Sequence, residues 1–292
     1  MFLNLCPQTI GLERVGFEDQ VELAARHGFG GVDFPAAEIS SAQDADRAAD
    51  LLAANGLRWG LFHLPCDFLQ GDDVAFQEGL ELVQEIASLA ARAGCTRTYN
   101  HVWPGSNERQ HEENWRWHVS RLRRLTDLLG PHGIRLGIEF IGPKTLRDSF
   151  RHPFVHTLPE AARLADAVGA DVGIVMDTFH WYTSGGTLDD IRATLTGRRV
   201  VNVHVNDAVP GRSREEQLDL ERQMPLTSGL VDAAGVLRVL DERGYEGPVI
   251  CEPFQPSLDR LRSMEPDTAA HTVADCMRRL FDAAGVAQRR PQ

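Results

Sequence analysis

The feature of this sequence that most restricts its fold is a repeat of short apolar runs separated by longer segments with helical periodicity. Eight runs have the β-branched and apolar composition of buried strands, and the segments between them carry apolar residues at helical spacing. The pattern is typical of βα units, in which each strand lies parallel to the last because a helix returns the chain. The predicted strands are 2–5, 31–34, 58–62, 97–101, 135–140, 172–176, 200–205 and 249–252.

Glycine marks the ends of the first three intervening helices. Glycine takes the left-handed conformation that closes a helix more readily than other residues, so a glycine directly after a periodic segment predicts its end. The three segments are 17–27, 42–55 and 73–93, followed by Gly28, Gly56 and Gly94. Five more helices are predicted at 107–129, 159–168, 188–195, 233–243 and 267–284.

An alternating βα series can form a closed barrel or an open doubly wound sheet. An open nucleotide-binding sheet carries a glycine-rich turn after its first strand, but residues 6–11 read CPQTIG, and neither GxGxxG nor GxxxxGK[ST] occurs anywhere. Eight units in 292 residues match the usual length of a (β/α)8 barrel. We therefore predict an α/β fold with one TIM-barrel domain over 1–292, in which the long polar segment 209–229 forms a lid loop.

Charge and cysteine content narrow the classes of partner. The net charge of −12 disfavours nucleic acid, because phosphate backbones are bound by clustered Lys and Arg. The five cysteines are widely spaced without a CxxC pair, which favours reduced thiols. The sequence shows neither a signal-peptide pattern nor an apolar run of about 18 residues. We expect a cytoplasmic protein that binds neither nucleic acid nor a membrane.

Four of the predicted strands carry a residue that can bind a metal at their carboxyl end, within one residue of the predicted boundary. These residues are Glu139, Asp177, His204 and Glu252, on the fifth to eighth strands. Strand ends of a barrel converge on one face, and three carboxylates buried together require a compensating cation. Any one of them alone would be read equally well as a solvated residue at a loop, but four on successive strands favour a metal site. Three oxygen donors and one imidazole suit Mn²⁺, Mg²⁺ or Co²⁺ better than a thiolate-type zinc site.

The segments that carry these residues resemble the xylose isomerase-like barrels, a family of sugar phosphate isomerases and epimerases that includes D-tagatose 3-epimerase and inosose dehydratase. The most specific segments are MDTFH at 176–180, VHVND at 203–207 and YEGPVICEPF at 245–254. The resemblance implies that the four residues hold a single divalent ion, with Mn²⁺ favoured and Mg²⁺ or Co²⁺ as alternatives. It also implies that Glu139 and Glu252 form the acid/base pair and that His180 contacts substrate. Dimers and tetramers are frequent among similar barrels, so a homo-oligomer is open by analogy.

The expected reaction is isomerisation or epimerisation of a small keto sugar or related polyol, with a sugar or cyclitol as the small-molecule partner. The metal would chelate a carbonyl and a neighbouring hydroxyl and stabilise the enediolate formed on proton loss. Glu139 and Glu252 would remove and return the proton. A metal-dependent lyase or dehydratase acting on a keto-inositol or oxidised glycoside stays open, because it shares the first step. A DNA-repair endonuclease would need more histidine ligands and a basic surface, and a non-catalytic sugar-binding subunit would have little need for three convergent carboxylates.

Six further residues are candidates for substrate contact, each with a structural alternative. The histidines follow or end strands, the tryptophan could pack against a sugar face, and the two cations could bind substrate oxygens. They are His63, His101, Trp103, Lys144, His180 and Arg222. No compact glycine-rich turn follows the seventh or eighth strand, where barrels commonly bind phosphate. An unphosphorylated substrate is therefore expected.

Overall fold

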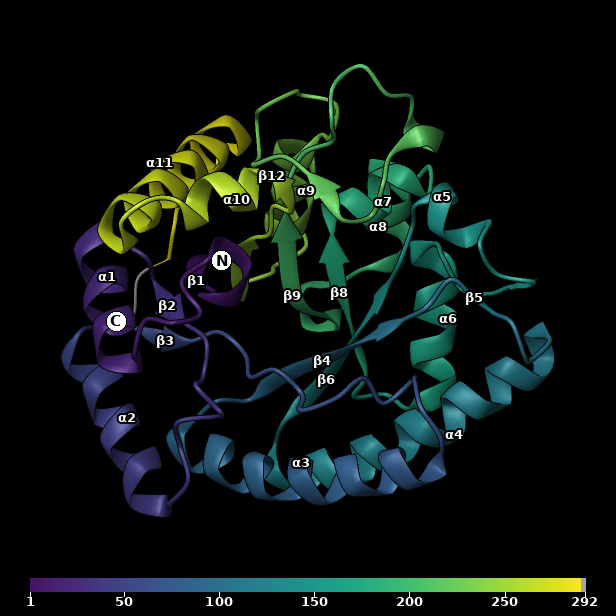
Figure 1. Ribbon diagram of the computed structural model, residues 1–292, viewed down its shortest axis with the longest axis horizontal. Helices are drawn as coiled ribbons and strands as arrows, with labels where there is room; N and C mark the ends of the chain where they lie inside the picture. The colour runs from purple at the N-terminus through teal and green to yellow at the C-terminus, as the bar shows by residue number, and fades with distance from the viewer. Residues whose placement is uncertain (290–292) are drawn as a thin grey trace.

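The computed structural model describes residues 1–289, and its centre is an eight-stranded sheet in which every paired strand is parallel (Figure 1). The strand order is β3-β2-β1-β11-β9-β8-β6-β4. The strands are β1 (Phe2–Leu5), β2 (Gly31–Val32), β3 (Arg58–Trp59), β4 (Arg97–Val102), β6 (Arg135–Phe140), β8 (Gly173–Asp177), β9 (Val200–Val205) and β11 (Pro248–Cys251). Among the described residues, these eight correspond in order to the eight predicted strands.

The two end strands of this order, β3 and β4, are joined where β3 runs out. Phe62 N, three residues beyond β3, donates a 3.0 Å hydrogen bond to the carbonyl of Arg97, the first residue of β4. Thr98 Oγ1 adds a 2.7 Å bond to the Phe62 carbonyl. The sheet is therefore curled into a ring, and the predicted (β/α)8 barrel is confirmed.

Helices surround the sheet, and each buries one face against it (Figure 1). The larger ones are α1 (Phe17–His27), α2 (Ala42–Ala54), α3 (Asp73–Ala93), α4 (His111–Leu129), α6 (Leu158–Val168), α8 (Leu188–Thr194), α9 (Ala233–Glu242) and α11 (Pro266–Ala284). Gly28, Gly56 and Gly94 have φ angles of 79°, 62° and 87°, so the three predicted glycine stops are confirmed. Among residues 1–289, no helix combines the length and apolar character needed to cross a membrane.

Short elements in the loops account for most differences from the predicted boundaries. β5 (Gly105–Ser106) pairs antiparallel with β7 (His152–Pro153), so α4 begins at His111 rather than at 107. The predicted strands 31–34 and 58–62 are too long, because β2 and β3 end at Val32 and Trp59. The remaining short elements are β10 (Glu221–Arg222), β12 (Gln255–Pro256), α5 (Lys144–Arg147), α7 (Thr178–Thr183), α10 (Ser257–Arg262) and 3₁₀ turns at Gln8–Ile10, Gly130–His132, Gly197–Arg199 and Arg214–Glu216.

The barrel interior below the strand ends is closely packed. A Cβ at Gly137 would lie 3.0 Å from the Val175 side chain and 3.4 Å from Tyr99 Cβ, so glycine leaves the room that these two side chains occupy. Gly137 precedes Glu139 by two residues, and Val175 likewise precedes Asp177. Because residues two apart on a strand point to the same side, Glu139 and Asp177 project above this packed layer.

Candidate metal centre and active site

The four strand-end residues meet at the mouth of the barrel, because β6, β8, β9 and β11 are neighbours in the sheet. His204 Nδ1 lies 3.1 Å from Glu139 Oε1, 3.3 Å from Glu252 Oε1 and 3.8 Å from Asp177 Oδ2. All four residues are buried, and one ligand atom from each lies within 4.8 Å of every other. We call Glu139, Asp177, His204 and Glu252 the carboxylate cluster.

Local structure fixes the direction of two of these side chains. Asp177 ends β8 and also caps α7, since its Oδ1 accepts hydrogen bonds from Phe179 N at 2.6 Å and His180 N at 2.9 Å. Its Oδ2 is left to face the cluster. His204 is fixed from the other side, because its Nε2 lies 2.9 Å from the Asn202 amide.

The Asn202 contact indicates the tautomer of His204. Asn202 Oδ1 is buried without a hydrogen-bond partner, while its Nδ2 faces the ring nitrogen. In the alternative assignment, with the amide oxygen and nitrogen exchanged, Oδ1 accepts the Nε2 hydrogen and Nδ2 takes the position without a partner. Nδ1 then presents a lone pair to three carboxylates, which is favourable only with a cation between them. This is the arrangement of a metal-bound histidine with a second residue orienting it.

The pKa values express the same excess of negative charge. Burial alone would lower the pKa of His204, but the charges of Glu252 and Glu139 outweigh it and raise the pKa well above its ordinary value. Burial raises the pKa of Asp177, against the opposing charge of Arg222. Burial would also raise the pKa of Glu139, but the neighbouring His204 lowers it overall. The buried negative charge of the cluster is therefore stabilised by a nearby positive charge.

Arg222 supplies a positive charge from the loop after β9. Its Nη1 donates 2.8 Å bonds to both Asp177 Oδ2 and Glu252 Oε2, and the guanidinium lies over the rings of Phe179 and Phe254 at 4.8 and 4.6 Å. Arg222 is only 2% exposed, so these charges are shielded from water. Its charge and that of His204 hold the pKa of Glu252 far below its ordinary value despite burial. The predicted lid segment 209–229 thus delivers a cation to the cluster, and its movement as a lid stays a prediction.

His180 lies beside this arginine. Its Nδ1 accepts a 3.2 Å bond from Gly142 N, and its Nε2 lies 3.2 Å from Arg222 Nη2 and 4.0 Å from Glu139 Oε1. With Nδ1 accepting, a neutral ring carries its hydrogen on Nε2, which then faces the N–H groups of Arg222 with no acceptor between them. The ring can therefore donate to a substrate oxygen there.

His101 borders the open side of the cluster. Its Nε2 is 3.4 Å from Glu139 Oε2, an oxygen that is buried without a hydrogen-bond partner, and the His101 side chain is 45% exposed. Tyr99 packs edge-on against both His101 and His204, with ring centroids 5.3 and 5.4 Å apart. Glu139 therefore keeps one oxygen available toward the accessible part of the mouth.

The structure does not bring the other three candidates into the carboxylate cluster. Trp103 donates a 2.7 Å bond to Asp67 Oδ2 and lines a cavity on the side of α4. Lys144 is 41% exposed and pairs with Asp148 one turn along the chain. His63 pairs instead with Asp33 at the ends of β2 and β3. For Lys144 the reason is local, because α5 turns its side chain along its own surface.

Three contributing residues were missed in the sequence. Asn202 and Asn206 flank His204 at a spacing of two, which places them on the same side of the chain, and Asn206 Nδ2 donates to Asp177 Oδ2 at 3.2 Å. The alternation along β9, continued to the residue that follows it, could have identified both. Asp219, whose Oδ1 accepts a 3.0 Å bond from Arg222, lies in an irregular loop that gives no comparable signal.

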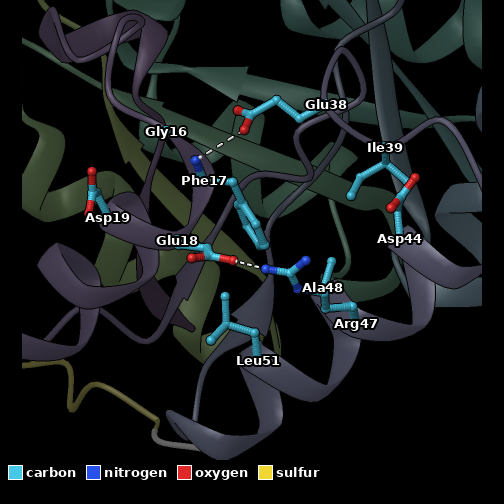
Figure 2. Close-up of a pocket in the computed structure, with 10 residues that line it drawn as sticks. All are labelled: Gly16, Phe17, Glu18, Asp19, Glu38, Ile39, Asp44, Arg47, Ala48 and Leu51. Carbon is cyan, nitrogen blue, oxygen red and sulfur yellow. Dashed lines mark hydrogen bonds and ion pairs between the residues drawn. The ribbon is translucent and has the colours of Figure 1, made fainter.

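A cavity of about 420 Å³ lies elsewhere, between the start of α1 and the side of α2. Figure 2 shows Glu38 accepting a hydrogen bond from Phe17 N and Glu18 paired with Arg47 at this cavity. None of the predicted site residues lines it. The chemistry of the chain is therefore concentrated at the strand ends rather than in this surface groove.

The carboxylate cluster fits a divalent ion. Three carboxylate oxygens and one imidazole nitrogen converge, Glu139 Oε2 has no hydrogen-bond partner, and His204 is oriented from behind. Together with the ring of parallel strands, the site defines a barrel protein with a cluster of metal-ligand side chains at the carboxyl ends of its strands. The chain belongs to the xylose isomerase-like TIM barrel family, whose model matches residues 21–280.

Named relatives agree with this family. The inosose isomerase of Halalkalibacterium halodurans (strain C-125) is 27% identical over 168 residues, which are 56% of this chain and 55% of that protein. The match thus spans about half the length of the relative. Among solved structures, the IOLI protein with a bound zinc atom has a TM-score of 0.79 at 19% identity, covering 98% of both chains. D-psicose 3-epimerase from Clostridium cellulolyticum H10, with D-tagatose, has a TM-score of 0.72 at 14% identity, covering 97% and 99%. At such low identity, the two structural likenesses establish the fold.

Proposed function

We propose that this chain is a divalent-metal-dependent isomerase or epimerase acting on a small keto sugar or keto-inositol. The observation that carries the proposal is the convergence of three buried carboxylates on one imidazole nitrogen, His204 Nδ1. A bound divalent ion supplies Lewis-acid polarisation of a substrate carbonyl. Mn²⁺ is the ion we favour, since three of the four donors are carboxylates.

Glu139 is the base in this proposal. Its Oε1 is turned toward His204, while Oε2 has no hydrogen-bond partner and faces the accessible side near His101. That oxygen is free to take a proton from the carbon next to a carbonyl. His101 Nε2, 3.4 Å away, can hold the resulting carboxylic acid in place.

Glu252 returns the proton from the other side of the cluster. Its Oε2 is bonded to Arg222 at 2.8 Å, so it can act only when the guanidinium shifts to a substrate oxygen. Return to the opposite face of the same carbon gives epimerisation, and return to the neighbouring carbon gives isomerisation. His180 and Arg222 orient substrate oxygens, since both present N–H groups beside the cluster.

The substrate class is supported by the relatives and by the polarity of the mouth. The relative that matches over 168 residues is named inosose isomerase. An inosose is a ketone on a polyol ring, so it offers the carbonyl and adjacent hydroxyl that the mechanism needs. The predicted absence of a glycine-rich phosphate loop supports an unphosphorylated substrate. We propose a neutral cyclic or open-chain ketose.

The test follows exchange of substrate α-hydrogen with deuterated water by NMR, using Mn²⁺-loaded protein with a panel of keto-inositols and ketohexoses. The wild-type chain should exchange one α-hydrogen and release an epimer or isomer, whereas Glu252→Gln should lose product formation. Product formation that is unchanged in Glu252→Gln would refute its role. Appearance of an unsaturated product would instead establish the lyase or dehydratase outcome.

A further inference from the structure

A second group of metal-binding side chains follows β1, β2 and β3, on the opposite side of the mouth from the carboxylate cluster. Cys6 Sγ lies 3.6 Å from His63 Nε2, and the same nitrogen lies 3.4 Å from Asp33 Oδ2. One ligand atom from each of the three lies within 4.8 Å of the others. We call Cys6, Asp33 and His63 the thiol cluster.

The separations match those of ligands around zinc. Zinc binds sulfur at about 2.3 Å and nitrogen or oxygen at about 2.0–2.2 Å in a tetrahedron, which places sulfur and nitrogen about 3.6 Å apart and nitrogen and oxygen about 3.3–3.4 Å apart. The two measured separations, 3.6 and 3.4 Å, agree with both values. A thiolate, an imidazole and a carboxylate are also all ligand types that zinc accepts.

Hydrogen bonds leave this cluster incompletely satisfied. Asp33 is 3% exposed, and its Oδ1 accepts bonds from Asn4 Nδ2 at 2.7 Å and Leu61 N at 3.1 Å. Its Oδ2, which points to His63, is buried without a hydrogen-bond partner. Without a metal, the Cys6 thiol can donate to His63 Nε2 or to Gln8 Oε1, both at 3.6 Å, and only the second choice leaves Nε2 free to donate to Asp33. A cation between the three groups would satisfy all of them.

The backbone is shaped to hold Asp33 in this position. A Cβ at Gly60 would lie 2.3 Å from Asp33 Oδ1 and 2.4 Å from Asn4 Nδ2, so only glycine lets the next strand pass so close to this pair. The carboxylate is therefore oriented by Asn4, much as His204 is oriented by Asn202. Such a supporting partner is characteristic of metal ligands.

We propose that Cys6, Asp33 and His63 bind a second divalent cation of the zinc class, separate from the ion at the carboxylate cluster. Three protein ligands leave a fourth position for water. A cavity of about 350 Å³ lined by Asp33 and His63 lies on the side of the cluster, and the His63 side chain is 33% exposed, so the ion can enter from solvent. On binding, the Cys6 thiol gives its proton to water and its sulfur forms the bond to the metal.

The chemistry of Cys6 makes the choice of metal specific. Burial and the neighbouring charge of Asp33 raise the pKa of the Cys6 thiol well above its ordinary value. A hard ion such as Mg²⁺ gains little from sulfur, whereas zinc and cobalt bind thiolate strongly enough to displace the proton. The two clusters should therefore differ in metal preference.

The test is titration of the metal-free full chain with Co²⁺, followed by absorption spectroscopy. A near-ultraviolet charge-transfer band appears only when cobalt binds thiolate, and the carboxylate cluster contains no sulfur, so the band reports the thiol cluster alone. The wild-type chain and Asp177→Asn should show the band, and Cys6→Ser should lack it. Cys251→Ser, which removes a buried strand-end thiol next to Glu252, and Cys66→Ser, which removes an exposed thiol, are the matched controls and should keep it.

Zinc stoichiometry by elemental analysis gives a second measurement. The wild-type chain should retain two ions after dialysis, and Cys6→Ser should retain one. Asn4→Ala changes a residue that touches no ligand atom of the proposed site. It should weaken cobalt binding at the thiol cluster, followed by the thiolate band, about 10- to 100-fold while the protein stays folded. A wild-type chain without the band, a band that survives in Cys6→Ser, or equal zinc content in both would overturn the proposal, whatever the fate of the isomerase activity.

Discussion

Strands β6, β8, β9 and β11 end in three carboxylates and one imidazole, whereas β1, β2 and β3, across the same mouth, lead into a thiol, a carboxylate and an imidazole. The first half has strands of four to six residues, with donors on the strands or directly after them. In the second half, β2 and β3 have two residues each, and His63 comes four residues beyond β3. The comparison teaches that one barrel geometry gathers donors on both sides, while the donor types decide which ion each side prefers.

The largest expected effect is on the rate of α-hydrogen exchange, which we assign to the half of the mouth that holds the carboxylate cluster. Glu139→Gln should lower α-hydrogen exchange about 10²- to 10⁴-fold, because it removes the proposed base. The matched control is Glu81→Gln on the exposed face of α3, which should exchange at the wild-type rate. Measured by NMR in deuterated water, equal rates in Glu139→Gln and wild type would remove Glu139 from the mechanism.

The next effect is on the free energy of unfolding, through the positive charge that Arg222 places beside the carboxylate cluster. In metal-free protein, Arg222→Ala should lower the free energy of unfolding by about 3–5 kcal/mol, since it leaves two buried carboxylates without their donor. Added Mn²⁺ should restore more stability to this variant than to wild type. Urea denaturation with and without metal measures both effects. The control is Arg212→Ala, which removes a partly exposed ion pair in the same loop and should lower the free energy of unfolding by at most about 1 kcal/mol.

A buried histidine outside both halves of the mouth makes the stability of the fold depend on pH in the acid range. Burial lowers the pKa of His118 in α4 to about 4, against an ordinary value of 6.5. Between these values the unfolded chain binds a proton that the folded chain does not, so stability falls as the pH drops from 6.5 to 4, by up to ~3 kcal/mol. His118→Gln should flatten that fall in urea titrations across this range, and His271→Gln, on the surface, should not. An unchanged slope in His118→Gln would exclude it as the source.

The smallest expected effect tests whether the halves are independent. Asn202→Ala removes the partner that orients His204 and should weaken metal affinity at the carboxylate cluster about 10- to 100-fold. Cobalt binding at the thiol cluster, followed by the thiolate band, should keep its wild-type affinity, since Asn202 does not contact the thiol cluster. Calorimetric titration with Mn²⁺ alongside cobalt spectroscopy makes the comparison, and a parallel weakening of both would show that the two halves are coupled.

The sequence predicted the fold and the carboxylate half well, because both depend on local patterns. Strand ends at Phe140, Asp177 and Val205 were placed within a residue by apolar runs, and the donors followed directly. The same rule applies to Cys6 and Asp33, which follow β1 and β2, yet Cys6 was predicted only as a reduced thiol, and Asp33, inside the predicted strand 31–34, was given no role. The thiol cluster became visible only when the distances across β1, β2 and β3 were known.

The contacts of Arg222 could not be predicted in the same way. Its position depends on an irregular path of the loop after β9 and on its pairing with the loop after β11, neither of which leaves a periodic pattern. The sequence identified it as a free cation that could bind substrate. Its hydrogen bonds to Asp177 and Glu252 are a tertiary property, since 45 and 30 residues respectively separate it from them along the chain.

The pairing of those two loops has a consequence for how a substrate reaches the cluster. β10, which carries Arg222, is hydrogen-bonded to β12, only three residues after Glu252, and Gln255 N also donates a 3.1 Å bond to the Leu220 carbonyl. Neither loop can swing outward alone without breaking this small ladder, so a lid movement of 209–229 would have to carry the loop after β11 with it. A substrate that enters without moving these paired loops would pass the opposite side of the mouth, where the rings of His63 and His101 are partly exposed.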